Sequence, residues 1–149
     1  MMLTNKLLYV TPEGLRIDWE LRHRLTIVVG DSATGKSFVY NSLKRKRALD
    51  ISKREDSIFV KMRFISQYDS PNLDELYTLN GNLILIDNAD ILLQDRLDMG
   101  ELVSGDSRNQ YIIFARSGIG VSASPNCFAE LIRHGKNLTL EYLYNVRGW

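Results

Sequence analysis

The chain has 149 residues, enough for one domain with a sizeable core and too few for two, so residues 1–149 are expected to form a single domain. Its net charge of +1 gives no bulk attraction to nucleic acid or acidic membranes, and no apolar run is long enough to span a bilayer. The single cysteine, Cys127, excludes an internal disulfide, is expected to be buried and inert, and fits a reducing cytoplasm.

The first predicted element is a β-hairpin. Residues 6–10 are an apolar strand candidate, and residues 11–14, Thr-Pro-Glu-Gly, have the composition of a turn. Residues 15–19 then alternate apolar and polar side chains, as a half-buried strand does. Residues 25–29 are a short apolar, β-branched run, which predicts a strand buried on both faces.

A glycine-containing motif follows this buried strand. Residues 30–37 match G-x-x-x-x-G-K-[ST], the phosphate-binding P-loop pattern, which requires a strand before it and a helix after it. Gly30 and Gly35 can adopt backbone angles that a Cβ would disfavour, so that successive N–H groups turn toward phosphate oxygens. Lys36 is expected to reach the β- and γ-phosphates, and Ser37 to supply a hydroxyl to Mg²⁺. The predicted nucleotide contacts are Gly30, Asp31, Ser32, Ala33, Thr34, Gly35, Lys36, Ser37 and Phe38.

The first helix is predicted from Gly35 to about Leu49. Its basic end, residues 44–47, is interpreted either as a nucleic-acid patch or as a solvated helix end, and the second is favoured because Asp50, Glu55 and Asp56 cancel much of the charge. Residues 57–65 predict the second core strand. Residues 70 and 71, Ser-Pro, predict the start of a short helix that presents Leu73, Leu76 and Tyr77 inward and stops at residues 80 and 81, Asn-Gly.

A second informative stretch is residues 82–87, Asn-Leu-Ile-Leu-Ile-Asp. Four aliphatic residues followed by Asp87 predict a central parallel strand with a carboxylate at its C-terminal edge, where ligands bind in open α/β sheets. This is the Walker B arrangement, in which Asp87 helps to hold Mg²⁺. Many P-loop ATPases have a glutamate immediately after this aspartate, as the base that orients the attacking water. Asn88 occupies that position here and cannot accept a proton. Asp90 is either a substitute base or, as we favour, the N-cap of the helix that begins at Ile91.

The last third of the chain predicts two strands and a helix. Residues 110–115 form another buried strand, and Arg116 at its end is either a phosphate contact or a surface cation. Residues 117–123 are small and glycine-containing, which predicts a mobile loop. Residues 124 and 125, Ser-Pro, predict a helix with Phe128, Leu131 and Ile132 inward and Gly135 as its stop; residues 138–144 predict the final strand.

Residues 30–37 and 82–87 together resemble the P-loop NTPases, and the strand at residues 111–115 after Walker B is similar to the branch that contains AAA-type and ABC-type ATPases. The resemblance implies a three-layer α/β fold with a central, mostly parallel sheet, helices on both faces and an N-terminal β-hairpin, with residues 111–115 between the P-loop and Walker B strands. Residues 14–17 resemble the start of ABC-type domains, and Gln67 compares with their glutamine loop. The chain departs from them: it has no L-S-G-G-Q-type signature and no helical lid, and Ala33 replaces a glycine.

The resemblance implies Mg²⁺-dependent ATP binding with slow hydrolysis, in a switch or motor subunit. The implied catalytic residues are Lys36, Asp87, Asn88, Asp90 and Arg116, and the implied metal ligands are Ser37 and Asp87. A protein partner or a second copy could supply an arginine in trans. The alternatives are a small-molecule or nucleoside kinase, and a module that binds ATP without hydrolysing it. GTP is disfavoured because the chain has no N-K-x-D element.

Overall fold

The computed structural model describes residues 2–31, 34–69, 73–117 and 121–144. These residues contain one sheet of eight strands in the order β1-β2-β8-β7-β3-β6-β5-β4. The strands are β1 (Lys6–Val10), β2 (Arg16–Glu20), β3 (Leu25–Val29), β4 (Met62–Ile65), β5 (Leu83–Ile86), β6 (Gln110–Ala115), β7 (Phe128–His134) and β8 (Asn137–Tyr142). The described α-helices are α1 (Lys36–Ser52), α2 (Ala89–Leu92) and α3 (Leu97–Gly105).

One part of the sheet is parallel. From β7 through β3, β6 and β5 to β4, each neighbouring pair runs in the same direction, so the carboxyl ends of these strands lie along one edge. β6 lies between β3 and β5, as the resemblance implied. The buried pattern of β3 and the fully buried β5 explain why both read as continuous apolar runs in the sequence.

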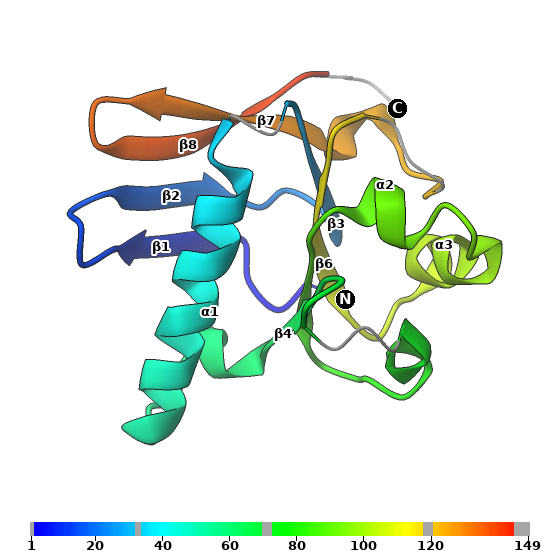
Figure 1. The fold of residues 1–149 in the computed structure, drawn as a ribbon, viewed down its shortest axis with the longest axis horizontal. Coiled ribbons are helices and arrows are strands. Elements are labelled where there is room, and N and C mark those ends of the chain that lie inside the picture. Colours follow the sequence, from blue (N-terminus) through cyan, green and yellow to red (C-terminus); the bar gives the residue numbers. More distant parts are fainter. Residues whose placement is uncertain (1, 32–33, 70–72, 118–120, 145–149) are drawn as a thin grey trace.

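The expected three-layer α/β fold is wrong. The sheet is mixed: β1–β2 and β7–β8 are antiparallel hairpins, and a parallel pairing of β2 with β8 joins them. The sheet curls into a half-barrel, and in Figure 1 the two hairpins run across the view whereas β3 and β6 run nearly upright. Antiparallel hairpins therefore make up one end of the sheet, where a three-layer fold would have parallel strands joined by helices.

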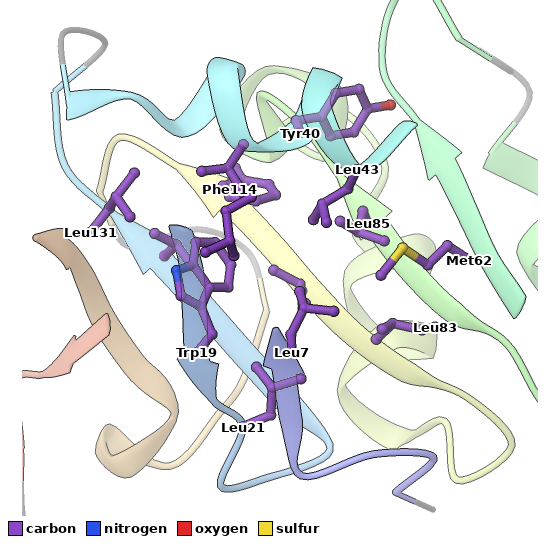
Figure 2. Close-up of a cluster of buried hydrophobic side chains, with 14 of the residues drawn as sticks. Leu7, Trp19, Leu21, Tyr40, Leu43, Met62, Leu83, Leu85, Phe114 and Leu131 are labelled. Carbon is purple, nitrogen blue, oxygen red and sulfur yellow. The ribbon is translucent and has the colours of Figure 1, made fainter. Parts of the chain in front are cut away.

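The core has two parts, one on each side of the curled sheet. The inner part packs the buried Tyr40 and Leu43 of α1 against Phe114 of β6 and against Leu7 and Trp19 of the N-terminal hairpin (Figure 2). The outer part packs the other faces of β3, β5 and β6 against α2 and α3. Because α1 is held by contacts from both ends of the sheet order, the residues at its N-terminus have a fixed position at the sheet edge.

The predicted helix after residues 124 and 125 is also wrong. Only the 3-10 helix Pro125–Cys127 forms, and the chain then enters β7, in which Ala129 and Leu131 are buried and Glu130 between them is exposed. The spacing of Phe128, Leu131 and Ile132 fits one helical face, but the alternation at residues 129–131 fits a strand and prevails. Gly135 does need its positive φ of 60°, in the tight turn that joins β7 to β8 instead of at a helix end.

Three smaller differences concern element boundaries. α1 continues to Ser52, past the predicted end. Residues Ile58–Lys61 are a 3-10 helix, so the second core strand is only β4. Residues Leu73–Tyr77 are a 3-10 helix in which Leu73 and Leu76 are buried but Tyr77 is 47% exposed, and the predicted helix start at residues 70 and 71 lies outside the described residues.

Candidate functional site

Lys36 is the first residue of α1, and its side chain folds back over the preceding loop. The side chain is buried, with 7% of its surface exposed, and its Nζ donates hydrogen bonds to the carbonyl oxygens of Gly30 and Asp31, the latter at 2.6 Å. A third contact joins Nζ to Oγ1 of Thr34 at 3.2 Å. The amine is therefore held over the centre of the loop, directly beyond the carboxyl end of β3.

Two glycines give the loop its shape, as predicted. Gly30 has a φ of 141° and Gly35 a φ of 96°, a left-handed region that L side chains rarely adopt. A Cβ on Gly30 would also lie 3.4 Å from Cγ2 of Thr34 and 3.8 Å from Nζ of Lys36. A side chain at either position would strain the loop. Residues 32 and 33, Ser-Ala, were predicted nucleotide contacts and lie outside the described residues.

The charged residues predicted for the site surround Lys36. Burial lowers the pKa of Lys36, Asp31, Asp87 and Asp90 raise it, and Arg116 lowers it. All four are therefore close enough to act on its charge. The backbone of Arg116 is also tied to the loop, because the Gly30 N–H donates to the Arg116 carbonyl at 3.3 Å. The structure thus gathers residues from the ends of β3, β5 and β6 around one amine.

Asp87 directly follows β5. Its N–H donates to the Ile65 carbonyl at 2.9 Å, which fixes the backbone against the end of β4, and its Oδ1 accepts the Asn88 N–H at 3.1 Å. Burial raises the pKa of Asp87, and so do the carboxylates of Asp69 and Asp90; the Asn88 N–H and Lys36 lower it. A half-buried carboxylate among other carboxylates is a place where a cation would relieve repulsion.

Asn88 adopts the left-handed conformation, with φ 50° and ψ 46°, at the start of α2. Asparagine tolerates this region better than most side chains. The Asn88 carbonyl accepts the N–H groups of Ile91 and Leu92 at 3.0 and 3.1 Å, so Asn88 is the N-terminal cap residue of α2. The favoured interpretation of Asp90 as the N-cap is therefore wrong, because Asp90 lies inside the first turn.

The other predicted site residues differ in burial. Ser37 is exposed on the first turn of α1. Phe38 is half-buried and packs against the inner core, so only its backbone could face the loop. The side chain of Arg116 is exposed at the end of β6.

Asp69 is a site residue that the sequence analysis missed. Its carboxylate pairs with Lys44 and accepts hydrogen bonds from the hydroxyls of Tyr40 at 3.2 Å and Ser66 at 3.4 Å, and it raises the pKa of Asp87. Its position just after the second core strand, at the edge where the other site residues lie, is the sequence feature that could have indicated it. Gln67, which the resemblance singled out in the same loop, is exposed.

No group of three or more His, Cys, Asp or Glu side chains is arranged to hold a metal ion within the part of the chain that the structure describes. Ser37 and Asp87 can offer two oxygen ligands. Mg²⁺ commonly takes one or two protein ligands and completes its shell with substrate phosphates and water. The oxygen donors and the carboxylate-rich surroundings of Asp87 fit such an ion.

A hollow lies beside β3. It has a volume of about 590 Å³ and is mainly apolar, and it lies at the ends of β3, β6 and β7. Its lining residues are Val29, Arg116, Ser117, Pro125, Phe128, Leu143 and Tyr144. Its volume falls within the ordinary range for small-molecule sites. The loop between β3 and α1, residues 30–35, which we call the glycine loop, therefore has carboxylates near Lys36 and an apolar hollow beside Val29.

The chain matches no family model, no curated protein and no solved structure. Within the described ranges, no helix combines the length and the apolar character that crossing a membrane requires. Cys127 is buried, as predicted, and burial raises the pKa of its thiol. The geometry around Lys36 is therefore the main indication of function.

Proposed function

We propose that the protein binds a nucleoside triphosphate, ATP in preference to GTP, together with Mg²⁺, and hydrolyses it slowly as a switch or motor-type subunit in the cytoplasm. The observation that carries the proposal is the Lys36 amine, held over a loop with two positive-φ glycines at the carboxyl end of β3, with Asp87 close enough to act on its charge. A helix N-terminus beside such a loop favours phosphate.

The arrangement suggests how the ligand would lie. The phosphates would occupy the loop, where Lys36 would exchange its carbonyl contacts for phosphate oxygens. Ser37 and Asp87 would hold Mg²⁺, which supplies positive charge to the phosphates when bound. The γ-phosphate would point toward Asp87, and the base would lie toward the apolar hollow with Phe128 and Tyr144.

Slow turnover follows from the residues beside Asp87. Asn88 can orient water through hydrogen bonds but cannot take its proton, and Asp90 lies within α2. An arginine supplied by a protein partner or a second copy would raise the rate, as trans-acting arginines do elsewhere. In this proposal the isolated chain is a binding unit with weak ATPase activity, and nucleic acid is not part of the mechanism.

The test is calorimetry with ATP, GTP and inorganic triphosphate, each with and without Mg²⁺. We expect both ATP and inorganic triphosphate to bind in the presence of Mg²⁺, with ATP the tighter because its base enters the hollow. Asp87→Asn should reduce the benefit of Mg²⁺ while leaving a metal-independent component. Failure of all three compounds to bind to the folded protein would refute the proposal.

A further inference from the structure

A second cavity lies between α1 and β4. It has a volume of about 390 Å³ and is lined by Lys44, Arg47, Arg63, Phe64, Tyr68 and Asp69. We call it the basic pocket, because three of its six lining side chains are cations and one is an acid. It is distinct from the glycine loop, although Asp69 links the two by acting on the charge of Asp87.

The cations of the basic pocket are unequally neutralised. Lys44 pairs with Asp69, and Arg63 lies 3.8 Å from Glu75, a long and partly exposed ion pair. Arg47 has no ion pair in the part of the chain that the structure describes, and its Nε is buried without a hydrogen-bond partner. Buried polar groups nearly always have partners, whereas the Arg47 guanidinium lines the cavity without a counter-charge of its own.

The positive charges of Arg47 and Arg63 also repel each other. Burial lowers the pKa of Arg47, and the neighbouring charge of Arg63 lowers it further. Two guanidinium groups held close together are unfavourable unless an anion lies between them. Guanidinium groups can bind phosphate through paired N–H donors, which makes phosphate a natural counterpart here.

The other cations of α1 do not share this position. Arg45 lies 3.5 Å from Glu13, and Lys46 lies 2.7 Å from Asp50 and above the rings of Tyr9 and Phe59. These contacts agree with the interpretation of residues 44–47 as a largely neutralised helix face. Arg45 and Lys46 thus have acidic partners outside the pocket, which favours a small ligand in the pocket over a long polyanion along the helix.

We infer that the basic pocket binds a small phosphomonoester, with its phosphoryl group between Arg47 and Arg63. The rest of the ligand lies against Phe64 and the ring of Tyr68, which is 84% exposed at the rim. The cavity volume lies within the range for small-molecule sites. This inference does not depend on the proposed triphosphate function, because the ligand is assigned to Arg47, Arg63, Phe64 and Tyr68 and not to Lys36.

The experiment uses phenyl phosphate and inorganic phosphate as probes of the full chain, with binding followed by calorimetry and by amide chemical shifts. Arg47→Met and Arg63→Met keep much of the aliphatic stem and remove the charge, and each should weaken phenyl phosphate binding at least tenfold. Arg45→Met is the matched control on the same helix and should leave the affinity within twofold. Lys36→Met should also leave it within twofold, while ATP binding weakens at least tenfold.

Several outcomes would overturn the inference. They are the absence of phenyl phosphate binding, equal losses in Arg45→Met and Arg47→Met, and loss in Lys36→Met, which would place the probe on the glycine loop. Tighter binding of a twelve-nucleotide single strand through Arg47 would show a polyanion surface instead. If either arginine variant does not fold, the amide chemical shifts of the unmodified protein locate the bound phenyl phosphate. The amides of residues 63–68 should shift, and shifts confined to residues 34–38 would contradict the inference.

Discussion

Replacing Lys36 by methionine is the most direct perturbation of the candidate triphosphate site. Methionine retains a flexible apolar side chain and removes the ammonium group. In the empty protein the loss is modest, because the Gly30 and Asp31 carbonyls that Lys36 contacts lie near the surface and can accept water instead. Burial lowers the pKa of Lys36, so the charge is itself held at some cost. We expect the free energy of unfolding to change by about 1 kcal/mol or less.

The effect on ligand affinity should be larger. A hydrogen bond between charged groups contributes about 1.5–3 kcal/mol, and losing it corresponds to about 10- to 150-fold weaker binding. Lys36 is mostly buried at the loop centre, so the contact is partly shielded from water and the upper half of this range is expected. The loss should be similar for ATP and for inorganic triphosphate, because it concerns the phosphates alone.

The assay is calorimetric titration with Mg²⁺–ATP, beside thermal unfolding of the same samples. Lys53→Met is the matched control, because Lys53 is an exposed lysine just beyond α1 and away from the loop. It should leave both the affinity and the melting temperature unchanged. An unchanged ATP affinity in folded Lys36→Met would refute the assignment of the loop.

Three further predictions concern specificity, pH and the basic pocket. ATP should bind more tightly than GTP, since the chain lacks the N-K-x-D element; competition binding that ranks GTP first would contradict this. Burial alone would raise the pKa of Asp106, but hydrogen bonds from Tyr111 at 2.6 Å, Asn109 and Arg108 hold it below its usual value. The ionised Asp106 therefore stabilises the fold above about pH 4, and this stabilisation is lost as the pH falls further. Asp106→Asn should be about 2 kcal/mol less stable at pH 7 and should show less loss of stability at low pH when unfolding in urea is measured. Arg47→Met should raise the melting temperature by about 2–4 °C because it removes an orphaned buried donor, and a lower melting temperature would mean that Arg47 has a structural partner.

The local features of the site could be predicted from the sequence. The two glycines, the lysine that follows them and the buried strand before them interact over a few residues, so the pattern determines most of their geometry. The acid at the end of β5 follows from the same logic, because an apolar run that ends in an aspartate needs only its own strand to place the carboxylate. The place of β6 between β3 and β5 came from the resemblance and agrees with the structure.

The curl of the sheet could not be predicted in this way. It depends on the pairing of Arg16 with Asn137 and of Ile17 with Leu138. These residues are far apart in the chain, and the local sequence of a strand does not determine which other strand it pairs with. It also depends on residues 128–134 forming a strand, where apolar spacing suited a helix equally well. Asp69 and Arg63 were missed for a related reason, and Arg47 was interpreted only as part of a basic helix end, since α1 packing beside β4 brings the three together.

The role of Asn88 gives the most demanding test of the proposed mechanism. With no proton acceptor at this position, the unmodified chain should hydrolyse ATP well below the roughly 10 s⁻¹ median of enzymes. Asn88→Glu adds the missing carboxylate, but the left-handed backbone with φ 50° disfavours glutamate relative to asparagine by about 1 kcal/mol. A change in turnover must therefore be separated from a change in the conformation of the residues that follow Asp87.

Two matched variants make that separation. Asn88→Gln has the length of glutamate and the same backbone strain without the charge, and Asn88→Gly removes the strain without adding a base. If Asn88 occupies the base position, Asn88→Glu should exceed Asn88→Gln in steady-state turnover while their ATP affinities agree. Asn88→Gly should not exceed the unmodified protein, because it adds no base and also loses the amide that can orient water. Equal turnover in all of these, with loss in Asp90→Asn, would assign the base to the first turn of α2. Fast hydrolysis by the unmodified monomer would contradict the prediction, because it would show that the missing base at Asn88 does not limit the reaction. It would also leave no need for an arginine from a partner.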